Sequence, residues 1–449
     1  MDPDGDQGRA DGTAARGRRG GRPPIFHGWK IVAGAAVVQA LQSGLIIQSF
    51  GSYAVILQRE FGWSRTTFSI AYSFNRAESG LLGPLQGWAL TRFGARRVMR
   101  IGVVVLALGF VLFSQVRTPV QFVAAFFVMA VGAGLSGFLT LTTETVRWFE
   151  RKRAKALSMM MIGFAVGGLA TPGVVWLLRT IGWRETALAS AAVVLVASYS
   201  LTSLFGGTPE ERGEHVDGIA PADVRPARFT AEGVSDVHFT AKEALRTRAF
   251  WMISLGHASA LLVVGSVIAH LSLYLTDERG FDVQGASYVA AGLTASQLVG
   301  MLAGGYLGDR MNKRLLACGA MLGHTAGLLL LTAATSSWMI WMFVAVHGVA
   351  WGLRGPLMGA MRADYFGATA FGQIMGISSM VLMFGIVGGP LLAGILADLT
   401  GSYATGFTIL ALLAGAGLVF FVLATPPPPP VRPAPGGDDV VDRSPAPAS

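Results

Sequence analysis

The segment Gly87-Trp-Ala-Leu-Thr-Arg-Phe-Gly-Ala-Arg96 recurs in altered form as Gly305-Tyr-Leu-Gly-Asp-Arg-Met-Asn-Lys-Arg314. The numbering of the two copies differs by 305 − 87 = 218. A constant offset in several separate segments indicates an internal duplication, and therefore two halves of similar fold. Two further pairs keep the same offset: Gly134-Leu-Ser-Gly137 with Gly352-Leu-Arg-Gly355, and Gly167 and Pro172 with Gly385 and Pro390.

Both copies lie between long apolar runs, in a chain of 449 residues that is 52% hydrophobic and only 14% charged. Soluble domains are about a quarter charged, and here residues 1–26, 207–248 and 426–449 hold 28 of the 61 charged residues. The rest of the chain cannot cover a water-facing surface, which excludes a soluble enzyme, a disordered protein and a disulfide scaffold. The single cysteine, Cys318, cannot form an internal disulfide.

Twelve apolar runs are long enough to cross a bilayer as helices, which requires about 20 residues each. They are too long and too rich in glycine for the strands of a membrane barrel. We therefore predict an all-α membrane protein with twelve transmembrane helices in two pseudo-symmetric six-helix bundles. The runs are residues 31–56, 68–90, 98–116, 120–146, 155–180, 186–206, 250–275, 284–308, 315–335, 338–361, 372–397 and 403–425.

The charged segments predict the domain organisation. Residues 1–27 and 426–449 are polar and have no apolar period, so we expect a disordered arm and a disordered Pro-rich tail. Between them we predict an N-terminal bundle over 28–206, a linker over 207–248 and a C-terminal bundle over 249–425. Residues 240–248 at the end of the linker are expected to form an amphipathic helix on the membrane surface.

Lys and Arg residues concentrate on alternate loops, which predicts the orientation of the chain. We expect a multi-pass monomer of the cell membrane with both termini, the arm, the linker and the tail in the cytoplasm. Short basic clusters between apolar runs indicate the lipid bilayer as partner and no nucleic acid, although the pI is near 10.0. The basic residues expected inside are Arg92, Arg96, Arg97, Arg100, Arg147, Arg151, Lys152, Arg153, Lys155, Arg310, Lys313, Arg314 and Arg362.

The two copies of the repeated segment resemble the signature loop of the major facilitator superfamily, G-x-x-x-D-R-x-G-R-R, between helices 2 and 3 and often between helices 8 and 9. The resemblance implies the major facilitator fold and a charge network around the acid that helps to close the cytoplasmic face. Thr91 replaces the acid in the first copy, so the usual ion pair is not expected there, and Asn312 replaces the glycine in the second. The gating residues that this pattern implies are Gly87, Arg92, Gly94, Arg96, Gly305, Asp309, Arg310 and Arg314.

Further segments resemble the monocarboxylate-transporter-like and oxalate/formate-antiporter-like branch of that superfamily. The acidic opening that animal carriers have before helix 1 is replaced here by Phe26-His-Gly-Trp29. The resemblance implies a carrier of small organic anions. The segments are Ser49-Phe-Gly-Ser-Tyr53, Glu60-Phe-Gly-Trp-Ser64, Trp148-Phe149 with Arg151-Lys-Arg153, Gly182-Trp-Arg184, Asp364-Tyr-Phe-Gly367 and Asp398-Leu-Thr-Gly-Ser-Tyr403.

Charged side chains inside predicted spans are the candidate functional residues, because a charge in a bilayer is costly unless it faces a partner or an aqueous cavity. Arg354 is the first candidate: its guanidinium matches a carboxylate, and Pro356 favours a bend beside it. The alternative is a buried ion pair or a clamp on backbone carbonyls between helices. The equivalent residue of the first half is neutral Ser136, which favours the binding role.

The predicted span 68–90 contains Asn75, Arg76 and Glu78. We expect Arg76 and Asn75 to contact the anion, unless Arg76 pairs with an acid on another helix. Glu78 is the candidate for proton coupling, because burial moves the pKa of a carboxyl toward the working range; its alternative role is a fixed partner for an arginine. Glu144 is expected to pair with Arg147.

We therefore predict a secondary transporter of small organic anions, monocarboxylates in particular, that works by alternating access with either protons or a counter-anion. The alternative is an exporter of hydrophobic or cationic compounds that depends on Glu78 rather than Arg354. The sequence shows no phosphate-binding glycine loop or catalytic triad, so we expect no enzyme and no cofactor. His257, His270, His324 and His347 are expected to be isolated packing residues, without metal-ligand spacing.

Overall fold

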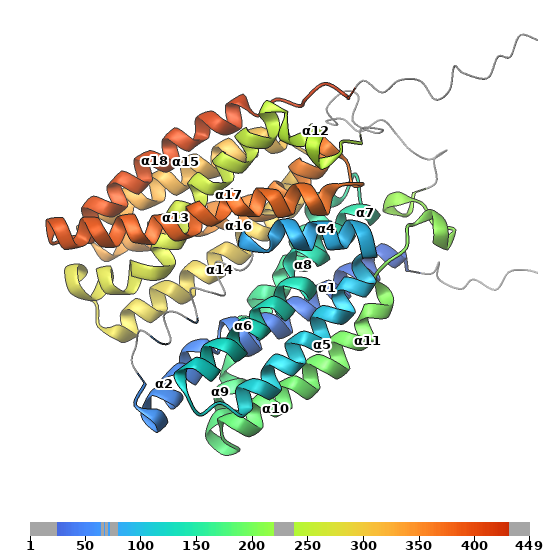
Figure 1. Cartoon of the computed structure of the whole chain (residues 1–449). Coiled ribbons are helices and arrows are strands. Elements are labelled where there is room, and N and C mark those ends of the chain that lie inside the picture. The colour runs from blue at the N-terminus through green and yellow to red at the C-terminus, as the bar shows by residue number, and fades with distance from the viewer. Residues whose placement is uncertain (1–24, 64–66, 68–70, 72–79, 220–237, 431–449) are drawn as a thin grey trace, which may run out of the picture.

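The structure, a computed structural model, describes residues 25–63, 67, 71, 80–219 and 238–430. Every regular element in these ranges is a helix, as predicted. Figure 1 shows two bundles of long helices side by side, one formed by the blue and green part of the chain and one by the yellow and red part.

The N-terminal bundle begins with one span built from α1 (His27–Gln42), the π-helical turn η1 (Ser43–Ile47) and α2 (Phe50–Phe61). The helices α4 (Gly83–Phe93) and α5 (Ala95–Ser114) follow. Gly137 then divides one span into α6 (Pro119–Ser136) and α7 (Phe138–Trp148). The bundle is completed by α8 (Arg153–Leu169), α9 (Thr171–Thr180), α10 (Trp183–Val193), η2 (Val194–Ser198), α11 (Tyr199–Leu201) and η3 (Thr202–Leu204).

The C-terminal bundle consists of longer, uninterrupted helices. They are α13 (Arg248–Arg279), α14 (Val283–Gly308), α15 (Lys313–Thr332), α16 (Ser337–Phe366), α17 (Phe371–Thr400) and α18 (Tyr403–Leu423). The helix α16 continues through Pro356, whereas the equivalent span of the first half is broken into α6 and α7.

Nine helical segments in the described part of the chain are long and apolar enough to cross a membrane. They confirm nine of the twelve predicted spans. The predicted spans 284–308 and 338–361 coincide with the continuous helices α14 and α16. Only part of the predicted span 68–90 lies within the described residues, where it ends as α4.

The duplication read from the sequence is present in the positions of the helices. The first residues of α5 and α15 differ in number by 313 − 95 = 218, those of α6 and α16 by 337 − 119 = 218, and those of α8 and α17 by 371 − 153 = 218. The ends of α2 and α13 also match, because Gly62 and Gly280 stop these helices with φ of 67° and 69°. Glycine is favoured at such a left-handed position because it lacks a Cβ.

The linker contains short helical turns, η4 (Glu210–Arg212), η5 (Val216–Gly218) and α12 (Ala241–Leu245). The prediction of one helix over 240–248 is wrong, because α12 ends at Leu245 and a new helix begins. The hydroxyl of Thr247 accepts a hydrogen bond from the backbone N–H of Phe250 at 3.2 Å and caps α13. The helix α12 packs against α13 and α17.

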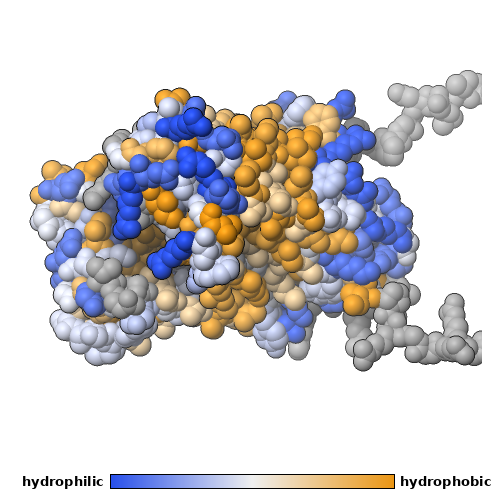
Figure 2. Space-filling view, turned by 90° about the horizontal axis from the view of Figure 1, so that it is seen from below, coloured by the Kyte–Doolittle hydropathy of each residue, from blue (hydrophilic) through white to orange (hydrophobic). Residues whose placement is uncertain are grey.

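The surface has an apolar band between two more polar ends (Figure 2). Large apolar side chains are also exposed along single helices, for example Val104, Leu108 and Val111 of α5, which are 48%, 51% and 40% exposed. A lipid environment accounts for such exposure. We call the polar end that holds the linker and the α4–α5, α7–α8, α14–α15 and α16–α17 loops the linker face. Figure 1 shows the start of α1 and the end of α18 on this side.

Candidate functional site

The two bundles are joined at the linker face by Asp309, which follows α14. Its Oδ1 accepts a hydrogen bond from the backbone N–H of Ala154 at 2.9 Å, and its Oδ2 accepts one from Lys155 at 3.1 Å. These N–H groups belong to the first turn of α8, where a helix has no internal acceptors for them and favours negative charge. Burial raises the pKa of Asp309 to about 6, although the two hydrogen bonds oppose that change.

An ion-pair network lies beside this cap. Arg153 Nη1 is 2.8 Å from Asp364 Oδ1, and Lys313 Nζ is 2.7 Å from Asp364 Oδ2. Arg153 belongs to the N-terminal bundle, whereas Lys313 and Asp364 belong to the C-terminal bundle. Deeper along α8, the hydroxyl of Ser158 donates to the carbonyl of Met301 on α14. Together with the Asp309 cap, these contacts connect the two bundles at the linker face.

Within the described residues, the first signature copy shows no such polar contact with the other bundle. The hydroxyl of Thr91 donates to the carbonyl of Gly87 in its own helix, at 3.1 Å. Gly87 instead allows α4 to approach α17, since a Cβ at this position would lie 2.4 Å from the carbonyl oxygen of Gly372. As expected from the replacement of the acid by Thr91, backbone packing takes the place of an ion pair here.

The remaining signature residues lie at the linker face but have different surroundings. Arg96 Nε donates to the carbonyl of Phe205 at 2.6 Å, after the last turn of the first bundle. Arg310 stacks on the Tyr306 ring at 3.8 Å. The other members are placed as follows: Gly94 precedes α5 with φ of 76°, Gly305 packs against Ser158, Arg92 is exposed, and Arg314 is half-buried in α15.

Arg354 lies within α16 and is only 2% exposed. Its Nε and Nη1 atoms are buried and have no hydrogen-bond partner in the described part of the chain. None of the ion pairs found there includes it. A buried guanidinium without a counter-charge is costly, because several kcal/mol of lost hydration are not compensated. In the described residues, the charge of Arg354 thus has no carboxylate beside it.

Arg354 is close to the boundary between the bundles. A Cβ on the next residue, Gly355, would lie 2.8 Å from Cε of Met161 on α8. On the other side of Arg354, Gly352 allows α16 to touch the backbone of α14 at Gln297. The equivalent residue in the first half, Ser136, is also buried and accepts a hydrogen bond from Gln42 Nε2 at 3.0 Å.

Arg362 is a second buried cation, and its predicted place in a loop is wrong. It is 1% exposed within α16, which continues to Phe366, beyond the predicted end at residue 361. Arg362 Nη2 donates to Ser378 Oγ on α17 at 2.7 Å, and Nη1 donates to the carbonyl of Met358 at 3.1 Å. Unlike Arg354, Arg362 therefore has partners within the protein.

The prediction that the four histidines are isolated is wrong for His324 and His347. Their Nδ1 atoms are 3.3 Å apart, and both side chains are fully buried between α15 and α16. The sequence did not indicate this contact, because the residues lie far apart along the chain, on different helices. Among the described residues, no group of three or more His, Cys, Asp or Glu side chains could hold a metal ion.

The remaining candidate residues from the sequence are those of the predicted span 68–90 and Glu144. Asn75, Arg76 and Glu78 lie outside the described residues. Glu144 pairs with Arg147 at 2.9 Å, as predicted, and its other oxygen accepts a hydrogen bond from the backbone N–H of Gly206 at 2.9 Å.

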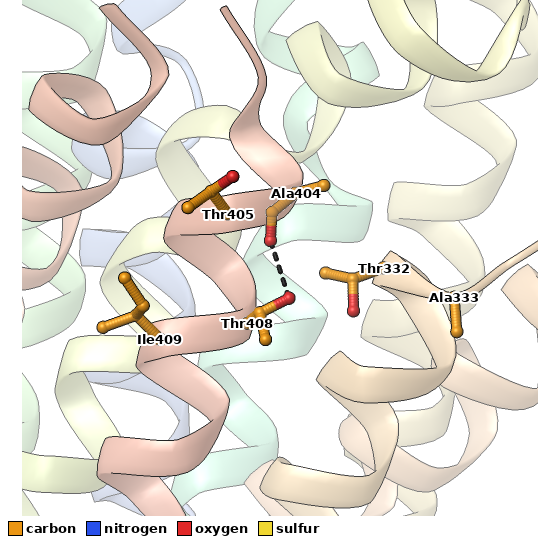
Figure 3. A pocket seen from close by; sticks show the side chains of 6 residues that line it. All are labelled: Thr332, Ala333, Ala404, Thr405, Thr408 and Ile409. Carbon is orange, nitrogen blue, oxygen red and sulfur yellow. Dashed lines mark hydrogen bonds between the residues drawn. The ribbon is translucent and has the colours of Figure 1, made fainter. Parts of the chain in front are cut away.

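A cavity of about 440 Å³ lies between the end of α15 and the start of α18 (Figure 3), and Arg354 does not line it. Its lining consists of Thr332, Ala333, Ala404, Thr405, Thr408 and Ile409. The hydroxyl of Thr408 donates to the carbonyl of Ala404 at 2.8 Å. Because its lining has no cationic side chain, this cavity is not suited to an organic anion.

Comparisons with known proteins agree with this architecture. The family described as the Major Facilitator Superfamily matches residues 33–353 and, in a second match, 255–448. Monocarboxylate transporter 11 of Mus musculus is 26% identical over 87% of this chain and 85% of its own length. The probable sulfoacetate transporter SauU of Cupriavidus necator is 24% identical over 83% of this chain and 88% of its own.

A solved structure shows the same fold. The human organic anion transporter MFSD10 superposes with a TM-score of 0.68 at 15% identity, covering 89% of this chain and all of that chain. The chain is thus a membrane transporter and not an enzyme, and it is similar over most of its length to monocarboxylate transporters. It belongs to the major facilitator superfamily.

Proposed function

We propose that the protein is a secondary active transporter of small organic anions, with monocarboxylates as the first substrates to test. The observation that carries the proposal is Arg354, a buried cation near the boundary of the two bundles without a carboxylate partner in the described ranges. Its guanidinium remains charged and presents a fork that matches a carboxylate. A bound anion would offset the cost of burying this charge.

The names of two relatives support a small anionic substrate. One is a monocarboxylate transporter and the other a probable sulfoacetate transporter. Both substrate classes carry a compact negative group that a single guanidinium can hold through two hydrogen bonds.

Alternating access is the mechanism we propose, with the linker face in the cytoplasm and both termini on that side. The excess of Lys and Arg in the loops of this face supports the orientation. The Asp309 cap and the Arg153–Asp364 pair close this face, and Figure 1 shows the bundles diverging away from it. The described arrangement therefore suits the outward-facing state, and the signature residues around Asp309 act as the inner gate.

Three residues remain proposals from the sequence alone. We assign Arg76 and Asn75 as further contacts to the anion, and Glu78 as a candidate for proton coupling. Glu78 suits proton symport, whereas two arginines without a coupled acid suit the exchange of one anion for another.

The test uses purified protein in detergent and in proteoliposomes. Lactate, pyruvate, oxalate and sulfoacetate are screened by the shift in melting temperature, and labelled anions that bind are then followed by uptake. Arg354→Ala is expected to lower uptake by about ten- to a hundredfold, which corresponds to the loss of a charged hydrogen bond. Arg354→Lys should retain part of the uptake, because it keeps the charge but not the fork.

Arg97→Ala is the matched control, because Arg97 is exposed and belongs to α5 at the linker face. It should transport like the wild type. Uptake by Arg354→Ala at the wild-type rate would refute the assigned anion site. If activity depends on Glu78 and tolerates the loss of Arg354, the protein is instead an exporter of cationic or hydrophobic compounds.

A further inference from the structure

The facing nitrogens of His324 and His347 require a defined arrangement of protons. Because the two Nδ1 atoms are 3.3 Å apart, a hydrogen bond between them needs one ring to donate and the other to accept. In the neutral pair, the donating ring then has a lone pair on its Nε2, and the accepting ring has its proton on Nε2. Both Nε2 atoms are buried without a hydrogen-bond partner in the described residues. The pair thus has one unused basic nitrogen.

Among the described residues, the charged group that interacts with the pair is a cation. The ring of Phe343 lies 5.2 Å from that of His347, and the neighbouring helices α14 and α18 contain no charged residues. Arg354 on α16 interacts electrostatically with both histidines, and with His257 on α13 and Arg362 further along α16. No carboxylate of the described part forms a hydrogen bond or an ion pair with any of these five side chains.

Burial and the positive charge of Arg354 both oppose the addition of a proton to the pair. An anion bound to Arg354 would cancel that charge and so remove the part of the opposition that Arg354 contributes. By thermodynamic linkage, the proton would strengthen the binding of the anion by the same factor.

We propose that the His324–His347 pair binds the proton that is co-transported with an anion held by Arg354. This inference rests on the proposed function and identifies its coupling ion. The proton binds to the free Nε2 of the donating ring, which becomes an imidazolium and continues to donate through Nδ1. No bond in the protein breaks, and the anion and the proton cross together with a net charge of zero for a monocarboxylate.

This arrangement differs from a pair that only fills space. A packing pair would leave the affinity for the anion independent of pH around neutrality. A proton-binding pair makes the anion bind about 5- to 150-fold more tightly when the pair is protonated, which is the usual range of coupling between two sites.

The experiment measures how many protons are taken up when an anion binds to the purified full-length protein. Lactate and sulfoacetate serve as probes in calorimetric titrations at several pH values, in buffers with different ionisation enthalpies. Wild-type protein is expected to take up close to one proton per anion, with affinity falling as the pH rises. In His324→Asn and His347→Asn, whose amides can replace Nδ1, the anion should still bind but proton uptake should be lost.

His270→Gln is the matched control, because His270 is bound through Nε2 to the carbonyl of Pro390 at 3.0 Å and belongs to the same bundle. It should keep proton uptake. Uptake that persists in both pair variants, or that is lost only in Glu78→Gln, would overturn the proposal. If the pair variants do not fold, the wild-type protein still provides a test. Anion binding without proton uptake would overturn the inference but not the proposed function. If the wild type binds neither lactate nor sulfoacetate, both are overturned.

Discussion

Glu60 and Glu278 occupy equivalent positions in the two bundles, since 278 − 60 = 218, and each connects the first span of its bundle to the last. Glu60 accepts a hydrogen bond from Trp183 Nε1 at 2.6 Å and pairs with Arg184 at 2.9 Å. Glu278 accepts hydrogen bonds from Ser402 Oγ and from the backbone N–H of Tyr403, both at 2.5 Å. Both contacts lie opposite the linker face, so each bundle is fastened internally at the end where the bundles diverge.

The Glu278 contact is expected to stabilise the C-terminal bundle. Glu278→Gln replaces one acceptor oxygen by an NH₂ group that cannot accept from Ser402 or Tyr403. The free energy of unfolding should fall by about 1.5–3 kcal/mol, the contribution of a hydrogen bond to a charged group, measured as a lower melting temperature in detergent. Glu210→Gln, at an exposed carboxylate in the linker, should leave the melting temperature unchanged. Equal melting temperatures for both variants would show that the contact contributes nothing.

Asp309 should make closure of the linker face depend on pH. Its pKa in the closed arrangement is raised to about 6 by burial, whereas an exposed Asp has a pKa of about 3.9. The closed face therefore binds a proton more tightly than the open face. The contribution of Asp309 to the stability of the closed face is therefore fully present below about pH 4 and is lost as the pH rises through about 6.

This dependence can be followed with a cysteine at Thr142, in a Cys318→Ser background. Thr142 is 1% exposed, lies beside Gly359 of the other bundle, and has a hydroxyl without a partner in the described residues. Labelling of Thr142→Cys, normalised to unfolded protein at each pH, should accelerate between pH 4 and pH 7, by at most about a hundredfold. Asp309→Asn should flatten this profile; an unchanged slope in that variant would assign the pH dependence to another group.

Close backbone packing between α4 and α17 should be needed for the same closure. A Cβ on Gly376 would lie 2.2 Å from the carbonyl oxygen of Gly83, so Gly376→Ala must push the two bundles apart. Overpacking of this kind costs about 1–3 kcal/mol, and labelling of Thr142→Cys should become about tenfold faster. Gly388→Ala on the same helix is the control, because its Cβ would meet only Leu262 Cδ2 at 3.6 Å. A similar effect of both substitutions would indicate a general loss of stability in α17.

The helices and the duplication could be predicted from the sequence because both are local or periodic properties. Apolar runs of sufficient length define spans, and one constant offset in the numbering relates the helix starts of α5, α6 and α8 to those of α15, α16 and α17. The pair of Glu144 and Arg147 was also predictable, because residues three apart share one face of a helix.

Contacts between distant segments could not be predicted in this way, because they depend on how each helix is rotated against its neighbours. His324 and His347 meet only because α15 and α16 turn these faces toward each other. Similarly, Arg362 was assigned to a loop because the end of α16 was placed too early, at 361 instead of Phe366. The sequence indicated that Arg354 lies in a span, but only the surroundings show that its Nε and Nη1 lack partners in the described part.

Asp217 should anchor the linker to the loop between α7 and α8. Its carboxylate accepts hydrogen bonds from the backbone N–H groups of Arg151 at 2.8 Å, and of Glu150 and Lys152 at 3.2 Å each. Its own φ of 61° is a conformation that glycine adopts without strain, so Asp217→Gly removes the acceptors without straining the backbone.

In Asp217→Gly, hydrogen exchange of these three amides should accelerate at least about tenfold, since one charged hydrogen bond already contributes about 1.5–3 kcal/mol. The amide of Gly285, which donates to Asp282 Oδ1 at 2.7 Å on the opposite side of the molecule, provides an internal reference and should exchange as in the wild type. Faster exchange at Gly285 as well would indicate global destabilisation. Unchanged exchange at residues 150–152 would mean that the loop holds its conformation without the linker, because its amides would then be protected by something other than Asp217.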